Sequence, residues 1–183
     1  MKHLFFPLIA LFIPLVAPGQ THCQKDETDY FSCQVKGGSK VISLCGGHLD
    51  TARNENSWLQ YRFGNPGEIE MAYPQREAGS LDKFEGNYFN PHGEDHDVIS
   101  LRFIALNALF DVSLAEYSQN PRISRLQGGV SVNAGKKSSY HSCQQPIRPV
   151  YLSRFRELYT LLPKPGATDF MSDFYRRKGG AGG

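Results

Sequence analysis

Short stretches in which apolar and polar residues alternate are the feature of this chain that most restricts its fold. Around residues 58–63 and 69–73 every second residue is apolar, and the turn sequence Gly64-Asn65-Pro66-Gly67 separates the two stretches. A period of two places successive side chains on opposite faces of a strand. Two such strands around a turn predict an antiparallel hairpin. We expect this hairpin to have one apolar face and one wet face, with Glu68 and Glu70 on the wet side.

The same pattern recurs along the chain, at residues 31–35 with 40–45, 98–105 with 109–117, and 128–133 with 138–143. Residues 75–97 lack it and are interpreted as a long loop. Residues 150–162 instead place Leu152, Phe155, Tyr159 and Leu162 at helical spacing. The sequence therefore predicts a mainly β protein, an antiparallel β-sandwich or small barrel of about eight strands. One C-terminal amphipathic helix completes it.

The first nineteen residues have the layout of a secretory signal peptide. A basic start is followed by an apolar run over 4–16 and by the small residues Ala17-Pro18-Gly19. The apolar run is too short to span a bilayer, so we expect no membrane span after cleavage and a periplasmic or secreted protein. The remaining segments are predicted as an extended stretch at 20–30, a β domain at 31–145, a helical segment at 146–175 and a disordered basic, glycine-rich tail at 176–183.

The charge of the chain is nearly balanced. Its 20 Lys and Arg residues face 18 Asp and Glu residues, giving a formal net charge of +2. Such a balance provides no extended field to attract nucleic acid or an anionic membrane. We therefore predict no nucleic-acid partner.

Four cysteines in an exported chain predict two structural disulfides. Cys23, Cys33, Cys45 and Cys143 contain no C-x-x-C motif, and their spacing fits no zinc module. Sequence alone leaves several pairings open. The hairpin over residues 31–45 brings Cys33 close to Cys45, so we favour a Cys33–Cys45 bond. The partner bond is then Cys23–Cys143.

Candidate chemistry is sparse. The loop residues His92, Glu94, His96 and Asp97 are possible metal ligands by type. However, Pro91 and Gly93 disfavour the helix that would align the two imidazoles, and we assign no metal or cofactor. His141 and Ser142 are neighbours on a predicted strand and would point to opposite faces, which disfavours a nucleophile–base pair. We identify no catalytic residue.

Trp58 is the candidate anchor for a partner. It falls on the strand face opposite Tyr61 and Phe63, which alternate toward the core. Exposed aromatic side chains often anchor protein partners or stack on sugars.

The chain resembles a group of small, exported, uncharacterised bacterial proteins over residues 31–143. The resemblance is carried by the cysteine-containing hairpin at 31–45, the Leu-x-Tyr-x-Phe-Gly strand at 59–64 and the acidic-apolar strand at 68–74. Leu101-Arg102-Phe103, Gly128-Gly129-Val130 and Cys143 match its second half more loosely. The resemblance implies a bacterial exported β-protein and carries no established activity.

These observations favour a non-enzymatic binding or inhibitory module of the cell envelope. Its partner would be an unknown protein or saccharide of the envelope or the host. One alternative is a metal- or saccharide-binding periplasmic protein, and a second is an unrecognised hydrolase. Fold-level analogy does not decide among these functions.

Overall fold

The computed structural model describes residues 20–47, 49, 55–75, 78–90, 96–120 and 123–166. The leader predicted at 1–19, the end of the predicted helical segment and the tail at 176–183 lie outside the described residues. Nine strands, one 3-10 helix and one α-helix are present in the part of the chain that is described.

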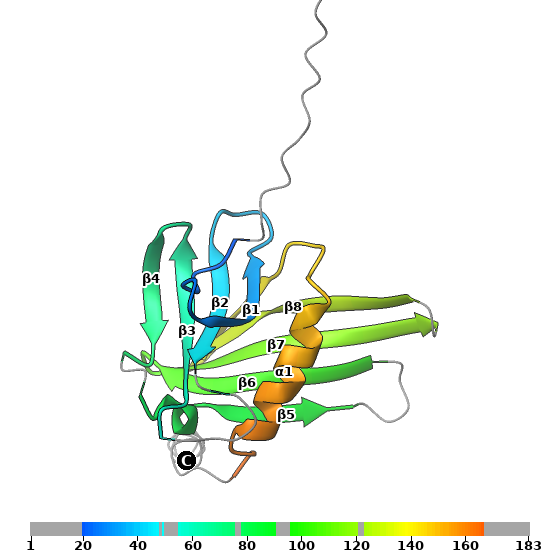
Figure 1. The fold of residues 1–183 in the computed structure, drawn as a ribbon. Helices are drawn as coiled ribbons and strands as arrows, with labels where there is room; N and C mark the ends of the chain where they lie inside the picture. Colours follow the sequence, from blue (N-terminus) through cyan, green and yellow to red (C-terminus); the bar gives the residue numbers. More distant parts are fainter. Residues whose placement is uncertain are drawn as a thin grey trace, which may run out of the picture.

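Two antiparallel sheets build the fold, each with its strands in chain order (Figure 1). The small sheet contains β1 (Thr28–Gln34), β2 (Val41–Gly47), β3 (Trp58–Asn65) and β4 (Glu68–Tyr73). The large sheet contains β5 (Glu85–Phe89), β6 (His96–Ala105), β7 (Ala108–Asn120), β8 (Ile123–Ala134) and β9 (Lys137–Ser142). The predicted mainly β class is confirmed, and the arrangement is a sandwich because the two sheets do not close into a barrel.

The core lies between the large sheet and a layer made of the small sheet and α1 (Val150–Leu161). In Figure 1 the strands of the small sheet run across those of the large sheet, and α1 lies beside them over β5, β6 and β7. The Tyr61 ring contacts Phe103, with centroids 5.1 Å apart. Phe31 on β1 packs edge-on against Phe155 of α1 at 5.2 Å. The helix predicted at 150–162 is confirmed, since α1 ends one residue earlier.

The segment predicted as a long loop contains regular structure. The 3-10 helix η1 (Ser80–Lys83) leads into β5, which pairs with β6 from Glu85 opposite Arg102 to Phe89 opposite Val98. The sequence of β5 shows no clear alternation, and its Gly86 lies close to Tyr159 of α1. The loop prediction is therefore wrong for residues 80–89, since tertiary packing stabilises a strand that local patterning does not indicate.

The β7–β8 hairpin is also longer than expected. The two strands are predicted at 109–117 and 128–133, but β7 continues to Asn120 and β8 begins at Ile123. The pairing of the two strands extends from Leu109 opposite Asn133 to the outer end of the hairpin. The polar composition of these residues is typical of a turn. Pairing with the neighbouring strand nevertheless keeps them in the sheet.

The predicted disulfide pairing is wrong. The bonds are Cys23–Cys45 and Cys33–Cys143. Cys33 lies opposite Ile42 in the β1–β2 register, and Cys45 is three residues further along β2. Side chains an odd number of positions apart point to opposite faces of a sheet, so Cys33 and Cys45 cannot meet. Cys33 faces the large sheet and reaches Cys143, whereas Cys45 faces outward and reaches Cys23.

The predicted wet face of β3 is covered. Residues 20–27, which we call the N-terminal strap, lie across the outer face of the small sheet and bury Gln60 and Arg62, the latter to 3% exposure. The Arg62 guanidinium donates to the two carboxylate oxygens of Glu27 at 2.6 and 2.8 Å. The backbone N–H of His22 donates to the Ser43 hydroxyl at 3.0 Å. Polar residues on this face therefore serve an internal network rather than hydration.

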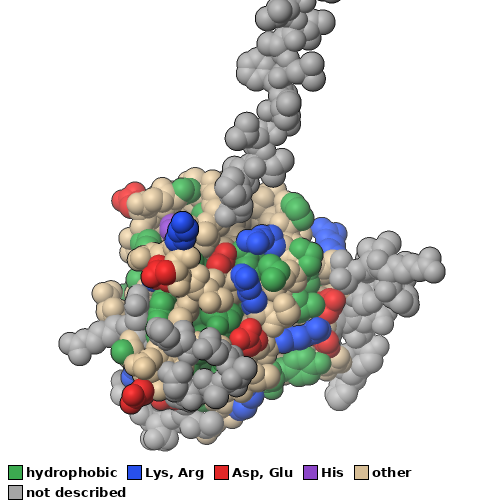
Figure 2. All heavy atoms as spheres, viewed as in Figure 1, with side chains coloured by type: hydrophobic (Ala, Val, Ile, Leu, Met, Phe, Trp, Pro, Cys, Tyr) green, Lys and Arg blue, Asp and Glu red, His purple; other side chains and the backbone are tan. Residues whose placement is uncertain are grey.

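The surface agrees with the balanced charge of the chain. Figure 2 shows basic and acidic side chains interspersed on the face that carries α1 and the small sheet. Within the described ranges, no helix combines the length and apolar character needed to cross a bilayer.

Candidate functional site

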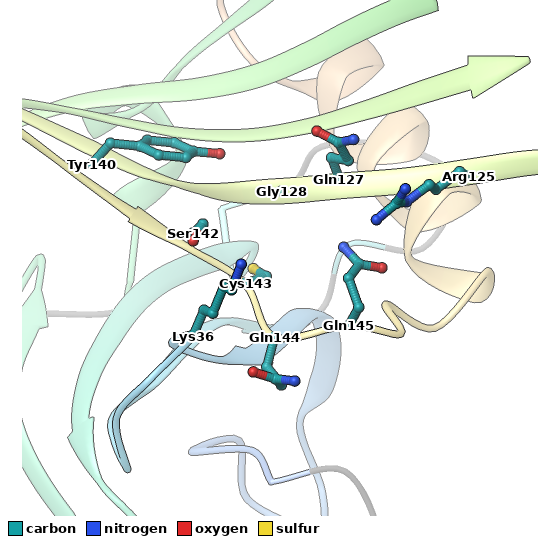
Figure 3. Close-up of a pocket in the computed structure, with 9 residues that line it drawn as sticks. All are labelled: Lys36, Arg125, Gln127, Gly128, Tyr140, Ser142, Cys143, Gln144 and Gln145. Carbon is teal, nitrogen blue, oxygen red and sulfur yellow. The ribbon is translucent and has the colours of Figure 1, made fainter.

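A polar groove lies where β9 ends and β8 continues. The β8–β9 pairing stops at Gly129 opposite Ser142, so the earlier part of β8 has no β9 residue beside it. The chain then leaves the large sheet and meets the end of the small one. Here the Lys36 N–H donates to the Ser142 carbonyl at 2.8 Å, and the Gln144 N–H donates to the Gln34 carbonyl at 2.7 Å. This corner encloses a groove of about 400 Å³ (Figure 3), lined by Lys36, Arg125, Gln127, Gly128, Tyr140, Ser142, Cys143, Gln144 and Gln145.

The groove carries two positive charges and no negative one among its described lining residues. Lys36 comes from the β1–β2 turn and Arg125 from β8, and both are exposed. Neither side chain forms an ion pair with a described residue. In Figure 3 Lys36 reaches toward Ser142 and Cys143, and Arg125 lies opposite Gln145. The electrostatics of the groove therefore favour an anion.

Tyr140 forms one wall of the groove and is held flat against β8. A Cβ on Gly129 would lie 2.8 Å from the Tyr140 ring and hydroxyl, so only glycine allows this placement. Burial of one side raises the pKa of the phenol, and a hydrogen bond with the Ser113 side chain partly offsets that rise. The side chain nevertheless remains 57% exposed. It presents a fixed aromatic surface beside the two cations.

The arrangement around β9 does not assemble a nucleophile with a base. The His141 ring faces inward and lies 6.2 Å from the ring of Phe63, whereas Ser142 lines the groove on the outer face. This confirms the expectation that these two neighbours point apart. Cys143 is held in its disulfide with Cys33. The described lining of the groove therefore provides polar contacts and charge rather than an activated nucleophile.

Of the four possible metal ligands predicted in the loop, the structure describes the side chain of Asp97. His92 and Glu94 lie outside the described residues, and of His96 only the backbone is described. The Asp97 carboxylate accepts hydrogen bonds from the Tyr88 hydroxyl at 2.9 Å and from the Asn90 amide. The contact with Asp97 raises the pKa of the Tyr88 phenol. Asp97 is thus already engaged by two donors, and the Arg156 guanidinium lies 4.0 Å from its second oxygen.

Among the described residues, a cluster of possible metal ligands lies elsewhere, and its atoms are also engaged. Donor atoms of Cys23, Glu27 and Cys45 lie within 4.8 Å of one another. The two sulfurs form a disulfide, and the Glu27 carboxylate accepts both hydrogen bonds from Arg62. The cluster is therefore a structural attachment of the N-terminal strap.

Trp58, the predicted partner anchor, lies away from the groove and is partly buried. Its indole covers Gly47 on β2, where an added Cβ would lie 2.4 Å from the indole nitrogen. Trp58 is thus packed on the sheet surface, and it is not among the residues that line the groove.

Sequence reasoning missed the groove residues Lys36, Arg125, Gln127 and Tyr140. The first three are ordinary polar residues in the sequence, and only the junction of two distant segments brings them together. The adjacent glycines Gly128-Gly129 within a strand were the available signal, because glycine in a strand often marks a close approach by another group.

No protein-family model, curated protein or solved structure matches this chain.

Proposed function

We propose that this protein is a non-enzymatic binding module and that the polar groove is its binding site. The observation that carries the proposal is the pair of cations, Lys36 and Arg125, which have no anionic partner among the described residues and face a groove without a described carboxylate. Positive charge concentrated in a concave site attracts and orients anionic ligands. The groove supports binding, since its described residues include no base positioned beside a nucleophile.

The setting we propose is the envelope of a bacterium, either in the periplasm or outside the cell. Two disulfides indicate an oxidising compartment. The signal-like start of the chain and the resemblance to exported bacterial proteins support the same assignment. The partner would be a protein or saccharide of the envelope or host that displays negative charge.

The proposal is tested by removing the charge of the groove. Oxidised protein comprising residues 20–183, labelled with ¹⁵N, would be titrated with an oligogalacturonate, an oligo-aspartate and an oligophosphate. We expect at least one of these anions to shift the amide signals of Gln127, Gly128 and Ser142. The double variant Lys36→Gln/Arg125→Gln should weaken that binding at least tenfold.

The matched control is Lys136→Gln/Lys137→Gln. It removes the same charge from two exposed residues at the β8–β9 turn, outside the groove. Equal weakening by both double variants would reduce the effect to net charge and contradict a specific site. Titrations in which none of the three anions moves the groove amides would refute the proposal.

A further inference from the structure

The groove combines three chemical features that together favour one class of ligand. These are a fixed aromatic surface, side-chain amides and a pair of cations. The proposed function requires only the cations, whereas the aromatic surface and the amides restrict the ligand further.

Tyr140 provides a flat surface for stacking. Its ring rests on Gly129, its hydroxyl is hydrogen-bonded to Ser113, and its side chain is 57% exposed. The face of an aromatic ring carries negative potential and attracts polarised C–H groups. Pyranose rings present such C–H groups on one face. Because the tyrosine is already fixed, stacking on it costs little further side-chain entropy.

Amide side chains line the same groove. Gln127, Gln144 and Gln145 line the groove, and each amide offers both a donor and an acceptor. The Gln145 amide donates to the Leu126 carbonyl at 3.0 Å, which fixes its orientation. Hydroxyl groups both donate and accept, so a ligand rich in hydroxyls matches these amides.

The backbone at this corner disfavours an extended peptide. A peptide that adds to a sheet edge needs free N–H and carbonyl groups along that edge. At the groove, the Ser142 carbonyl already accepts from the Lys36 N–H, and the Gln144 N–H already donates to Gln34. The end of β9 is thus joined to the small sheet. On the adjoining part of β8, the Gly128 carbonyl accepts from the Cys143 N–H and the Leu126 carbonyl from the Gln145 amide. These occupied backbone groups favour a ligand that binds through side chains.

We propose that the groove binds an acidic saccharide, with a pyranose ring stacked on Tyr140 and its carboxylate held by Lys36 and Arg125. Arg125 can bind a carboxylate through two parallel N–H donors, and Lys36 adds a second charge. The groove volume of about 400 Å³ suits a small segment of such a chain. This inference rests on the proposed function, because it names the ligand class of the same site.

The test is calorimetric titration of the oxidised 20–183 protein with tetrasaccharides of galacturonate, alginate and hyaluronan. Cellotetraose is the neutral control and tetra-aspartate the acidic peptide control. We expect at least one acidic tetrasaccharide to bind, while both controls bind at least tenfold more weakly. Tyr140→Ala should weaken saccharide binding roughly fivefold to tenfold, whereas Tyr140→Phe, which keeps the ring, should retain most of it.

Phe89→Ala is the matched control for Tyr140→Ala. Phe89 is equally exposed at 57% and lies on β5, outside the groove lining. Its removal should leave saccharide binding unchanged. Salt adds a second readout, because screening should weaken binding by wild type and Tyr140→Ala alike and should have less effect on Lys36→Gln/Arg125→Gln.

The outcomes separate the two proposals. If tetra-aspartate binds through Lys36 and Arg125 but no acidic saccharide does, the saccharide inference is wrong and the binding function stands. Saccharide binding that Tyr140→Ala leaves intact would also overturn the inference. If none of the acidic tetrasaccharides, tetra-aspartate or the oligophosphate binds, both proposals fail.

Discussion

At the scale of single residues, the most consequential contact is the buried ion pair between Arg62 and Glu27. The two side chains are only 4% and 7% exposed. Arg62 also donates to the His22 carbonyl at 2.9 Å and to the Gln60 side chain at 2.6 Å. A buried charge is tolerated when paired and hydrogen-bonded in this way. The pair therefore holds the N-terminal strap on the small sheet.

Removing one partner of this pair should be strongly destabilising. Glu27→Gln leaves the Arg62 charge buried without its counter-ion, and we expect a loss of about 3 kcal/mol in the free energy of unfolding. Urea denaturation of the oxidised protein measures it. The control is Glu70→Gln, which breaks the more exposed Lys40–Glu70 pair and should cost less than about 1 kcal/mol. Equal losses in the two variants would contradict the assigned role of Arg62–Glu27.

At the scale of elements, α1 completes the layer that the four strands of the small sheet leave open. Phe155 and Tyr151 of the helix pack against Phe31 on β1. The Tyr151 hydroxyl also donates to the Asp29 carboxylate at 2.8 Å. Burial and this neighbouring carboxylate raise the pKa of Tyr151 to about 12. These contacts hold the helix against β1, the strand that leads into the turn with Lys36.

Shortening Phe155 should therefore destabilise the whole sandwich. Its side chain is fully buried, and Phe155→Ala should cost about 3–5 kcal/mol through lost burial and a residual cavity. Val150→Ala on the same helix is the control, because Val150 is 38% exposed. This change should lower the free energy of unfolding by well under half as much as Phe155→Ala. Thermal or urea unfolding distinguishes the two. A small effect of Phe155→Ala would mean that α1 is not an integral part of the core.

At the scale of the whole molecule, one junction connects the two sheets next to the groove. Val35 pairs with Cys143 in an isolated bridge, and the Cys33–Cys143 bond lies beside it. The bonded cysteines are 110 residues apart, whereas Cys23 and Cys45 are 22 apart. The two bonds thus differ greatly in the length of chain that they close.

Loop closure predicts a ranking of the two disulfides. Cys33→Ala/Cys143→Ala should lower the free energy of unfolding by about 5 kcal/mol, and Cys23→Ala/Cys45→Ala by about 3 kcal/mol. Urea titrations of both double variants under oxidising conditions measure the difference. Peptide mapping of the unreduced wild type should recover Cys23 linked to Cys45. A Cys33–Cys45 peptide would contradict the register described above.

Strand positions were predictable from the sequence because alternation is a local property. The hairpins around residues 36–39, 64–67 and 134–137 all occur near their predicted places. Each depends on neighbouring residues and on turn formers, whose preferences hold wherever the strand is later packed. The helix at 150–161 was predictable for the same reason, since its apolar spacing is contained within one element.

The sequence could not predict which sheet faces are covered by other segments, because the covering segments are distant in the chain. Gln60 and Arg62 have the spacing of a wet face, and only the position of the N-terminal strap buries them. The disulfide pairing was mistaken for a related reason, since proximity in a hairpin suggested a bond that the exact register forbids.

Local sequence thus established the mainly antiparallel β class, most of the hairpins and the helix, because periodicity and turn chemistry act over a few residues. Tertiary structure alone decided the disulfide partners, the burial of Arg62 and the groove. Lys36, Arg125 and Tyr140 come together only where the end of β9 meets the β1–β2 turn. Such contacts between distant segments leave no periodic trace in the sequence, since each residue alone is an ordinary surface residue.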